Sequence, residues 1–225
     1  MLSYEQFVPG KRRAAAAVRE EPARARLDVD ERRKQLVALG LDLFGARPFD
    51  EVSIDELAAA AGISKGLLYH YFPTKKDFYV ATVRESARQL YERTSQDTAG
   101  EPLERLHAGL DAYLDYVVEH QQPYTALLRS GVGVDAEVAR IVDDTRAALT
   151  ARLLEGTPVD AKDPLVRLAV RGWIGFVEAA TLEWLDGKRR VARGKLRELL
   201  AQTLMRTLEG VASPPPVLPP ASGGG

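Results

Sequence analysis

The chain has 225 residues, 45% hydrophobic and 28% charged, which is enough for one large or two small domains with a buried core. It contains no cysteine, which excludes a disulfide framework and thiolate metal sites and fits a reducing cytoplasm. The formal net charge is -1, and residues 1–80 balance 13 Lys and Arg against 12 Asp and Glu. Any attraction to nucleic acid must therefore come from the local placement of cations.

The N-terminal residues, 1–27, are expected to form a flexible basic arm. Residues 11–13 are basic and precede only a short alanine run, so no secretory leader is expected. Residues 20–22, which end in a proline, interrupt the basic stretch, so its composition favours a disordered tail. The alternative is an arm that lies along phosphates or in a minor groove. No apolar run approaches the roughly 18 residues that would predict a membrane span.

The first predicted helix begins at Asp28 or Asp30 and ends between Gly45 and Pro48. Its apolar residues recur at helical spacing, so one face is expected to pack against the helices that follow. That face consists of Leu36, Leu39, Leu43 and Phe44, with Val37 at its edge.

The next stretch predicts two short helices joined by a tight turn. Ser53 and Glu56 have the spacing of a capping box, and Gly62 stands where a helix end favours a left-handed residue. Ser64 caps the second helix and Pro73 ends it. This order predicts a helix-turn-helix, whose second helix can enter a DNA major groove.

The remainder is predicted to be helical throughout. A long helix from about Lys75 to Thr98, capped by Thr74, is expected to act as a lever between two domains. The fold class is therefore all-α, with a three-helix helix-turn-helix domain at 28–74 and a second helical domain at 75–211. The further helices are expected at 102–120, 123–130, 135–155, 163–187 and 190–209, and the Pro-, Ser- and Gly-rich residues 212–225 form a disordered tail.

An ordered run within residues 30–80 carries a more specific signal. It consists of Leu43-Phe44, FDEVSIDELA at 49–58, AGISKG at 61–66, LYHYF at 68–72 and Lys75-Lys76. This run resembles the TetR family of bacterial transcriptional regulators. Pro48 and Leu67 depart from the commonest pattern, and Leu67 replaces a hydroxyl residue that would offer a polar DNA contact. The resemblance implies a homodimer on a palindromic operator that acts, most often, as a repressor released by a small ligand.

The predicted DNA contacts lie on the second short helix and on both sides of it. Ser53 and the first amides of its helix can meet a phosphate, and Lys65 can contact a guanine edge or a phosphate. Leu67 can offer only apolar contact, for instance to a thymine methyl. The resemblance places Tyr69 and Tyr71 toward phosphate and His70 beside the bases, although on a helix at least one of the three is expected to be core. The full set is Ser53, Ser64, Lys65, Gly66, Leu67, Tyr69, His70, Tyr71, Lys75 and Lys76.

The second domain is expected to supply a ligand pocket and a dimer contact. Pocket candidates are Tyr113, Tyr116, Tyr124, Leu127, Leu128, Trp173 and Phe176, with Arg171 or Glu178 as a polar anchor. Plain core packing is the alternative for the apolar residues, and solvent exposure for the two charged ones. Dimer candidates on the last two long helices are Gly172, Gly175, Ala179, Ala180 and Trp184, with packing inside one chain as the alternative.

Two rival functions remain open at this stage. Glu104 and His107 have the Glu-x-x-His spacing of di-iron bundles, but the sequence holds one copy and three histidines in all. The other rival is a helical domain that binds a protein partner. The sequence favours a cytoplasmic DNA-binding regulator that is not an enzyme and needs no metal or cofactor. Its expected partners are operator DNA, a small-molecule effector and a second copy of the chain, without a membrane.

Overall fold

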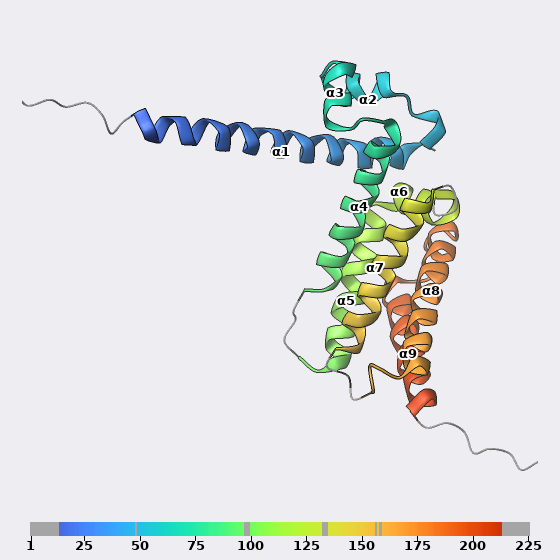
Figure 1. The fold of residues 1–225 in the computed structure, drawn as a ribbon. Helices are drawn as coiled ribbons and strands as arrows, with labels where there is room; N and C mark the ends of the chain where they lie inside the picture. Colours follow the sequence, from blue (N-terminus) through green and yellow to red (C-terminus); the bar gives the residue numbers. More distant parts are fainter. Residues whose placement is uncertain are drawn as a thin grey trace, which may run out of the picture.

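The computed structural model describes residues 14–47, 49–96, 100–131, 135–155, 157 and 159–212, with side chains from residue 29 onward except 130 and 131. These residues form helices and no strand, as predicted for an all-α fold (Figure 1). Part of the predicted arm, residues 1–13, and all of the predicted tail except Ala212 lie outside the described residues. The helices are α1 (Ala14–Ala46), α2 (Ile54–Ala60), α3 (Lys65–Tyr71), α4 (Lys75–Thr94), α5 (Pro102–Glu119), α6 (Gln121–Ala126), α7 (Ala136–Leu154), α8 (Pro164–Asp186) and α9 (Arg193–Ala212), with short helical turns η1 (Phe49–Glu51) and η2 (Leu127–Gly131).

Helix α1 is longer than the sequence predicts. It begins at Ala14, so the expected start at Asp28 or Asp30 is wrong and Pro22 does not interrupt it. A proline inside a helix removes one backbone hydrogen bond, whereas the alanines, arginines and glutamates beside it all favour helix. Farther along α1, Val37 is buried with Leu36, so it belongs to the apolar face rather than its edge.

The N-terminal unit consists of α1, α2, α3 and the start of α4 around one apolar core (Figure 1). Leu57, Leu68, Phe72 and Phe78 are fully buried in it. Gly40 of α1 packs directly on α4, because a Cβ at this position would lie 2.6 Å from Thr82 Oγ1 and 2.9 Å from Phe78 Cζ. The first half of α4 is therefore packed as part of the N-terminal unit.

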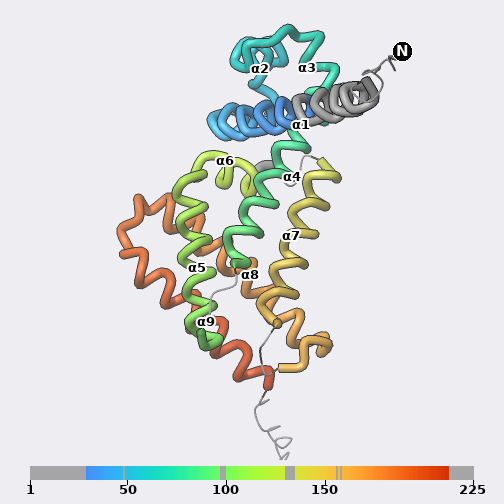
Figure 2. The backbone as a smooth tube through the Cα atoms, turned by 90° about the vertical axis from the view of Figure 1, so that its left-hand side faces the viewer, coloured from blue at the N-terminus to red at the C-terminus, as the bar shows by residue number. Residues whose placement is uncertain are grey.

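The second unit is a bundle in which α4 packs on α5 and α7, and α8 packs on α7 and α9 (Figure 2). Its core collects apolar residues from α5 to α9, among them Leu114, Val170 and Leu200. Asp163 caps α8 and Pro164 stands in its first turn, as predicted. The predicted end of the last helix at Gly210 is wrong, because α9 continues to Ala212; an exposed glycine weakens a helix by about 1 kcal/mol but does not end it.

Helix α6 connects the two units. It touches α1 through Pro123, whose Cδ would lie 2.7 Å from a Cβ at Gly45. The next residue, Tyr124, is buried in the core of the second unit. The helix predicted for 123–130 is therefore split into α6 and the wider π-helical turn η2. Of the predicted break at Gly131 and Gly133, Gly131 belongs instead to η2, and Gly133 lies outside the described residues.

Candidate nucleic-acid interface and ligand cavity

The capping box predicted for α2 is confirmed. The Ser53 hydroxyl accepts a hydrogen bond from the Glu56 amide at 3.1 Å, and the Ser53 amide donates to the Glu56 carboxylate at 2.8 Å. Hydrogen bonds from the Ser53 backbone and side chain and from Arg47 lower the pKa of Glu56 to about 2. A carboxylate at the positive end of α2 is thus fixed in its charged form.

The turn between α2 and α3 also agrees with the sequence prediction. Gly62 adopts φ +64°, in the left-handed region that L side chains rarely adopt, and no atom lies near the position of an added Cβ. The Ser64 hydroxyl accepts from the Leu67 amide at 3.2 Å and caps α3. This turn sets the orientation of α3 relative to α2.

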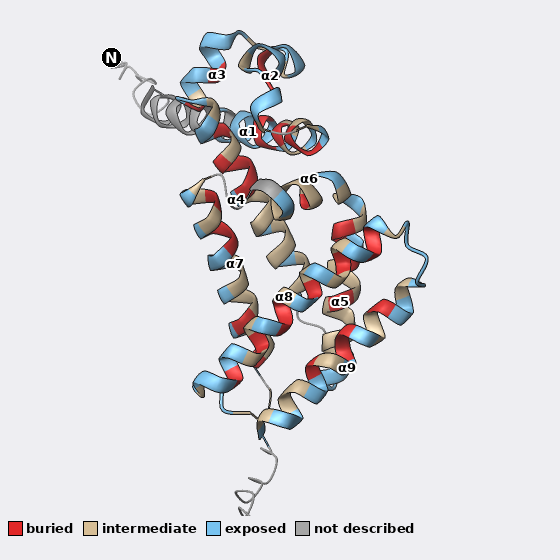
Figure 3. Cartoon of the chain, turned by 90° about the vertical axis from the view of Figure 1, so that its right-hand side faces the viewer, coloured by how far each residue is buried: buried red, intermediate tan, exposed pale blue. Residues whose placement is uncertain are grey.

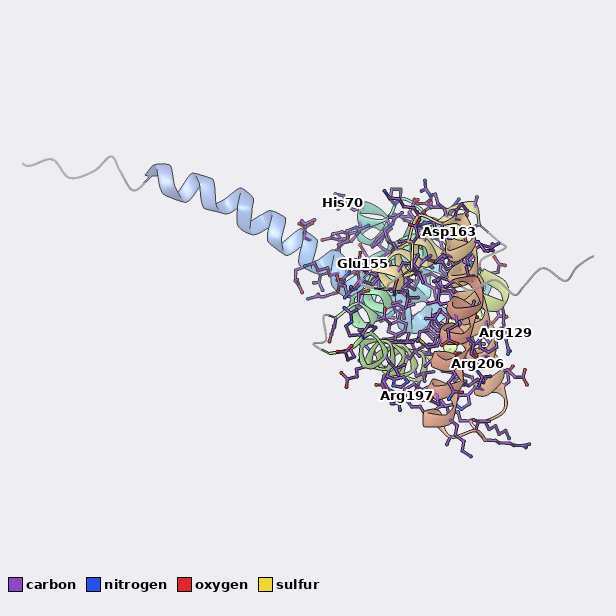
Figure 4. The ribbon with its side chains drawn as sticks, turned by 90° about the horizontal axis from the view of Figure 1, so that it is seen from below. His70, Arg129, Glu155, Asp163, Arg197 and Arg206 are labelled. Atoms are coloured by element: carbon purple, nitrogen blue, oxygen red, sulfur yellow. The ribbon has the colours of Figure 1, made fainter. Side chains whose placement is uncertain are left out.

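Helix α3 separates its residues into a buried and an exposed side. Leu68 and the following Phe72 are buried in the N-terminal core. Tyr71 is half-buried against that core and contacts His70 edge-on, as expected for at least one residue of the aromatic run. The exposed residues, with His70 labelled in Figure 4, are Ser64, Lys65, Gly66, Leu67, Tyr69 and His70.

The three predicted DNA-contacting lysines all have partners within the chain. The Lys65 ammonium lies 3.1 Å from the carboxylate of Asp55, and the Lys75 ammonium lies 4.2 Å from the centroid of the Phe49 ring. Lys76 approaches Asp135 to 2.7 Å. Lys65 and Lys76 are about half exposed, so a phosphate can compete for their charges.

The Lys76–Asp135 pair joins the two units. Asp135 also caps α7, since its carboxylate accepts from the amides of Glu137 and Val138 at 2.8 and 3.3 Å. The Lys76 ammonium and these amides lower the pKa of Asp135, whereas Asp135 raises the pKa of Lys76. A second ion pair, Arg84–Glu137 at 3.0 Å, links the same two helices eight residues farther along α4.

A cavity of about 240 Å³ lies inside the second unit, lined by residues of all helices from α4 to α9. Six of the predicted pocket residues line it: Tyr113, Tyr116, Tyr124, Leu127, Leu128 and Trp173. Phe176 does not line it, because its side chain faces outward and is 39% exposed. The placement of Phe176 in the pocket is therefore corrected: α8 carries apolar residues on more than one face, and Phe176 is among the exposed ones. Figure 3 shows that α8 has both buried and exposed positions.

Three polar pairs lie among the apolar residues of the cavity wall, which also includes the charged side chains of Arg105, Arg152 and Glu155. Glu178 accepts two hydrogen bonds from Arg146, at 2.9 Å from Nε and 2.7 Å from Nη2. The hydroxyls of Tyr113 and Tyr124 lie 2.5 Å apart, and that of Tyr116 lies 2.7 Å from Ser86 Oγ.

The sequence did not single out Arg146, since it is one of several arginines on a helix that shows no clean apolar stripe. Of the two predicted anchors, Glu178 lines the cavity. Arg171 does not, and it pairs instead with Asp143 at 3.4 Å.

The outer face of α8 carries exposed apolar and small residues. Leu165 and Leu168 are 55% and 68% exposed, and added Cβ atoms at Gly172 and Gly175 would meet nothing within 4 Å. Trp184, predicted as a dimer anchor, is instead buried inside the chain, where its indole donates to the Val191 carbonyl at 2.7 Å. That bond fixes the connection from α8 to α9.

The described residues do not support the alternative of a di-iron site at Glu104 and His107. In the part of the chain that the structure describes, no three His, Cys, Asp or Glu side chains converge as a metal site would require. His107 Nε2 lies 3.4 Å from a Glu198 carboxylate oxygen. None of the described helices has both the length and the apolar composition needed to cross a membrane.

Comparisons with known proteins agree with this arrangement. Residues 36–82 match the family model described as "Bacterial regulatory proteins, tetR family", and residues 102–207 match that of "Tetracyclin repressor-like, C-terminal domain". A solved tetR-family transcriptional regulator from Streptomyces coelicolor is 37% identical, with a TM-score of 0.74 over 82% of this chain and 84% of that chain.

Two curated relatives are more distant. The transcriptional activator FasR of Mycolicibacterium smegmatis is 26% identical over 170 residues, which cover 74% of this chain and 78% of FasR. The transcriptional repressor KstR of Rhodococcus jostii is 27% identical over 156 residues, 69% of this chain and 73% of KstR. With a helix-turn-helix at one end, a cavity-bearing bundle at the other and these relatives, the chain belongs to the TetR family of DNA-binding transcriptional regulators.

Proposed function

We propose that the chain is a ligand-responsive repressor that binds a palindromic operator as a homodimer and leaves it when a small molecule enters the cavity. One observation carries this proposal. Helix α4 begins with Lys75 and Lys76 beside the DNA-reading helix, and farther along it lines the cavity through Val83, Ser86 and Leu90. A single helix therefore belongs to both the proposed DNA-binding surface and the wall of the ligand cavity.

The exposed side of α3 supports major-groove binding. Lys65, Leu67 and His70 present a cation, an apolar group and an imidazole to solvent, which suit a guanine or phosphate, a thymine methyl and a base edge. Ser53, Tyr69 and Tyr71 can position the helix through phosphates. Binding would require Lys65 to exchange Asp55 for DNA, and an exposed ion pair resists this exchange only weakly.

The outer face of α8 supports the homodimer. Leu165, Leu168 and Phe176 are apolar side chains exposed in one protomer, and Gly172 and Gly175 permit close approach of another helix. Pairing this face and part of α9 with their symmetry mates would form an isologous four-helix contact. Such a dimer sets its two reading helices about 34 Å apart, or a multiple, for a palindromic site.

The cavity supports a small-molecule effector over a protein partner, because a protein partner would need no internal space. A ligand can shift the dimer away from its DNA-competent form by no more than its differential affinity for the two forms. Its named relatives include an activator and a repressor. We favour repression because a dimer seated on an operator blocks a promoter without further contacts. Its site of action would be the cytoplasm, where bacterial DNA lies.

Recovery of genomic fragments by the purified protein, with and without a pool of metabolites, tests this function. We expect enrichment of one palindromic sequence and its loss with an active metabolite. Transcription in vitro from an enriched fragment should fall when protein is added and recover with the metabolite. Failure to enrich any palindrome would contradict the proposal. Increased transcription on addition of the protein would contradict the proposed repression.

A further inference from the structure

We propose that the cavity binds an uncharged, largely apolar ligand whose hydrogen-bond acceptor, such as a ketone or ester oxygen, meets the Tyr113–Tyr124 pair. This inference rests on the proposed function, which gives the cavity an effector, and it names the chemical class of that effector. The cavity wall supplies the argument in three steps, which concern its charges, its hydroxyl hydrogens and its size.

Arg146, a largely buried cation of the cavity wall, is already held by two carboxylates. Arg146 donates from Nε and Nη2 to the two oxygens of Glu178, and from Nη1 to Asp143 at 3.1 Å. The Arg146 and Glu178 side chains are 19% and 20% exposed, so their charges are largely removed from water. A ligand carboxylate at Arg146 would meet the like charges of Glu178 and Asp143, or would displace Glu178 and leave that carboxylate buried without its partner. A ligand ammonium would leave Arg146 in the same position.

The hydroxyls of the cavity leave one hydrogen to donate. Tyr116 donates to the Ser86 carbonyl at 3.0 Å, which leaves the Ser86 hydroxyl to donate to the Tyr116 oxygen at 2.7 Å. The three lining threonines donate to backbone carbonyls of their own chain segments: Thr145 to Ile141, Thr94 to Leu90 and Thr157 to Leu154. Tyr113 and Tyr124 share one hydrogen bond between two hydroxyls, which leaves one hydrogen over. The buried Thr181 hydroxyl beside Tyr113 is not part of the cavity lining, so its hydrogen is not offered to a ligand.

Both tyrosines keep their protons at neutral pH. Burial raises the pKa of Tyr113 to about 12, and burial and the neighbouring Tyr113 raise the pKa of Tyr124 well above its ordinary value. The pair therefore presents a neutral donor within an apolar wall. A buried donor without a partner is costly, so an acceptor on the ligand is favoured there.

The dimensions favour a compact molecule. A volume of about 240 Å³ lies below the usual range of about 300–1,000 Å³ for drug-sized ligands. Two further arginines line the cavity. Arg152 on α7 pairs with Glu155 at 3.0 Å, and Arg105, half-buried on α5, lies eight residues or about 12 Å of helix from Tyr113. Water competes for a charge that is half exposed, so we expect Arg105 to attract an anionic end only weakly.

Matched nine-carbon probes test the class: 2-nonanone, nonanoate and nonylammonium, titrated by calorimetry into the full chain without DNA at neutral pH. We expect 2-nonanone to bind at least tenfold more tightly than either ion. Nonanoate or nonylammonium binding as tightly as 2-nonanone, or no binding by any of the three, would overturn the proposal.

Two variants test whether the ligand's hydrogen-bond acceptor meets the Tyr113–Tyr124 pair. The double variant Tyr113→Phe/Tyr124→Phe should weaken 2-nonanone binding roughly 3- to 10-fold, the value of one neutral hydrogen bond. Tyr91→Phe, on α4 and outside the cavity lining, is the matched control and should bind 2-nonanone as the parent does. An unchanged affinity in the folded double variant would overturn the role of the pair. If the double variant fails to fold, the ranking of the three probes still decides the class.

The same probes separate this inference from the proposed function. Release of operator DNA by nonanoate but not by 2-nonanone would overturn the ligand class and leave the proposed function standing. Tight binding of 2-nonanone by a protein that enriches no operator would support the ligand class and contradict the proposed function.

Discussion

The ammonium of Lys76 lies 2.7 Å from the carboxylate of Asp135, which ties the first turn of α4 to the N-terminus of α7. Lys76 is also among the residues proposed to meet operator phosphate. Asp135 and DNA would then compete for one cation, and the pair would oppose DNA binding while it holds α4 against α7.

Substitution of Asp135 by asparagine tests this competition. Asparagine can still cap α7, so the change removes mainly the charge. We expect Asp135→Asn to bind operator roughly two- to fivefold more tightly at low salt, measured by fluorescence anisotropy. Glu137→Gln, which releases Arg84 from the neighbouring ion pair, serves as the control. Weaker operator binding by Asp135→Asn would show that the pair supports the DNA-competent form.

Loss of Lys65 should weaken operator binding and change its salt dependence. If Lys65 meets a phosphate, Lys65→Ala should reduce the slope of log affinity against log salt by about one. Asp55→Asn removes the partner of Lys65 within the chain and should leave the affinity equal or higher. A slope that Lys65→Ala does not change would rule out the phosphate role.

The capping box of α2 should make the N-terminal unit sensitive to acid. The pKa of Glu56 is lowered to about 2, so its stabilising effect is fully present above its ordinary value of 4.5. That stabilisation is lost as the pH falls from 4.5 through 2. Glu56→Gln keeps a side-chain acceptor but cannot titrate, so chemical denaturation between pH 2 and 4.5 should show a shallower loss of stability. Identical pH profiles of parent and variant would contradict this assignment.

A methyl group at position 40 should disturb the packing of α1 on α4. The nearest atoms to a Cβ there belong to Thr82, whose hydroxyl is held by the Phe78 carbonyl at 2.9 Å, and to the fully buried Phe78. Overpacking costs about 1–3 kcal/mol, more than the gain of about 1 kcal/mol when alanine replaces a helical glycine. Urea denaturation should therefore show that Gly40→Ala is destabilised. Gly66→Ala, which has space for its methyl group, should not be.

A charge on the outer face of α8 should separate the protomers of the proposed dimer. Leu168 is 68% exposed in one chain, so Leu168→Glu should leave the fold of the protomer intact. Light scattering after gel filtration should give the mass of a monomer for this variant and of a dimer for the parent. Leu103→Glu places the same charge on an exposed leucine of α5 and should remain dimeric. Equal masses for the two variants would show that the dimer contact does not lie on the outer face of α8.

Local features of this fold were readable from the sequence, because the residues that form them are neighbours in the chain. The caps at Ser53, Ser64 and Thr74 and the left-handed Gly62 all arise from contacts within about three residues. The contact between Arg146 and Glu178 spans 32 residues and depends on how α7 meets α8, so no periodicity predicts it.

Helix α8 shows a different limit. Its apolar residues surround much of the helix, so the pattern could not show that Trp173 faces the cavity and Phe176 faces outward. The start of α1 differs from the sequence prediction because the helix-forming residues on both sides of Pro22 outweigh the hydrogen bond that this proline removes.

Helix α6 has six residues, yet two adjacent ones face different units: Pro123 lies against Gly45 of α1, while Tyr124 lines the cavity. If Tyr124 selects the ligand, a substitution that alters ligand choice also shifts the support beneath the DNA-binding unit. A new effector preference would then arrive together with a new basal operator occupancy. During evolution, a change in effector preference would then require a second substitution that restores operator occupancy.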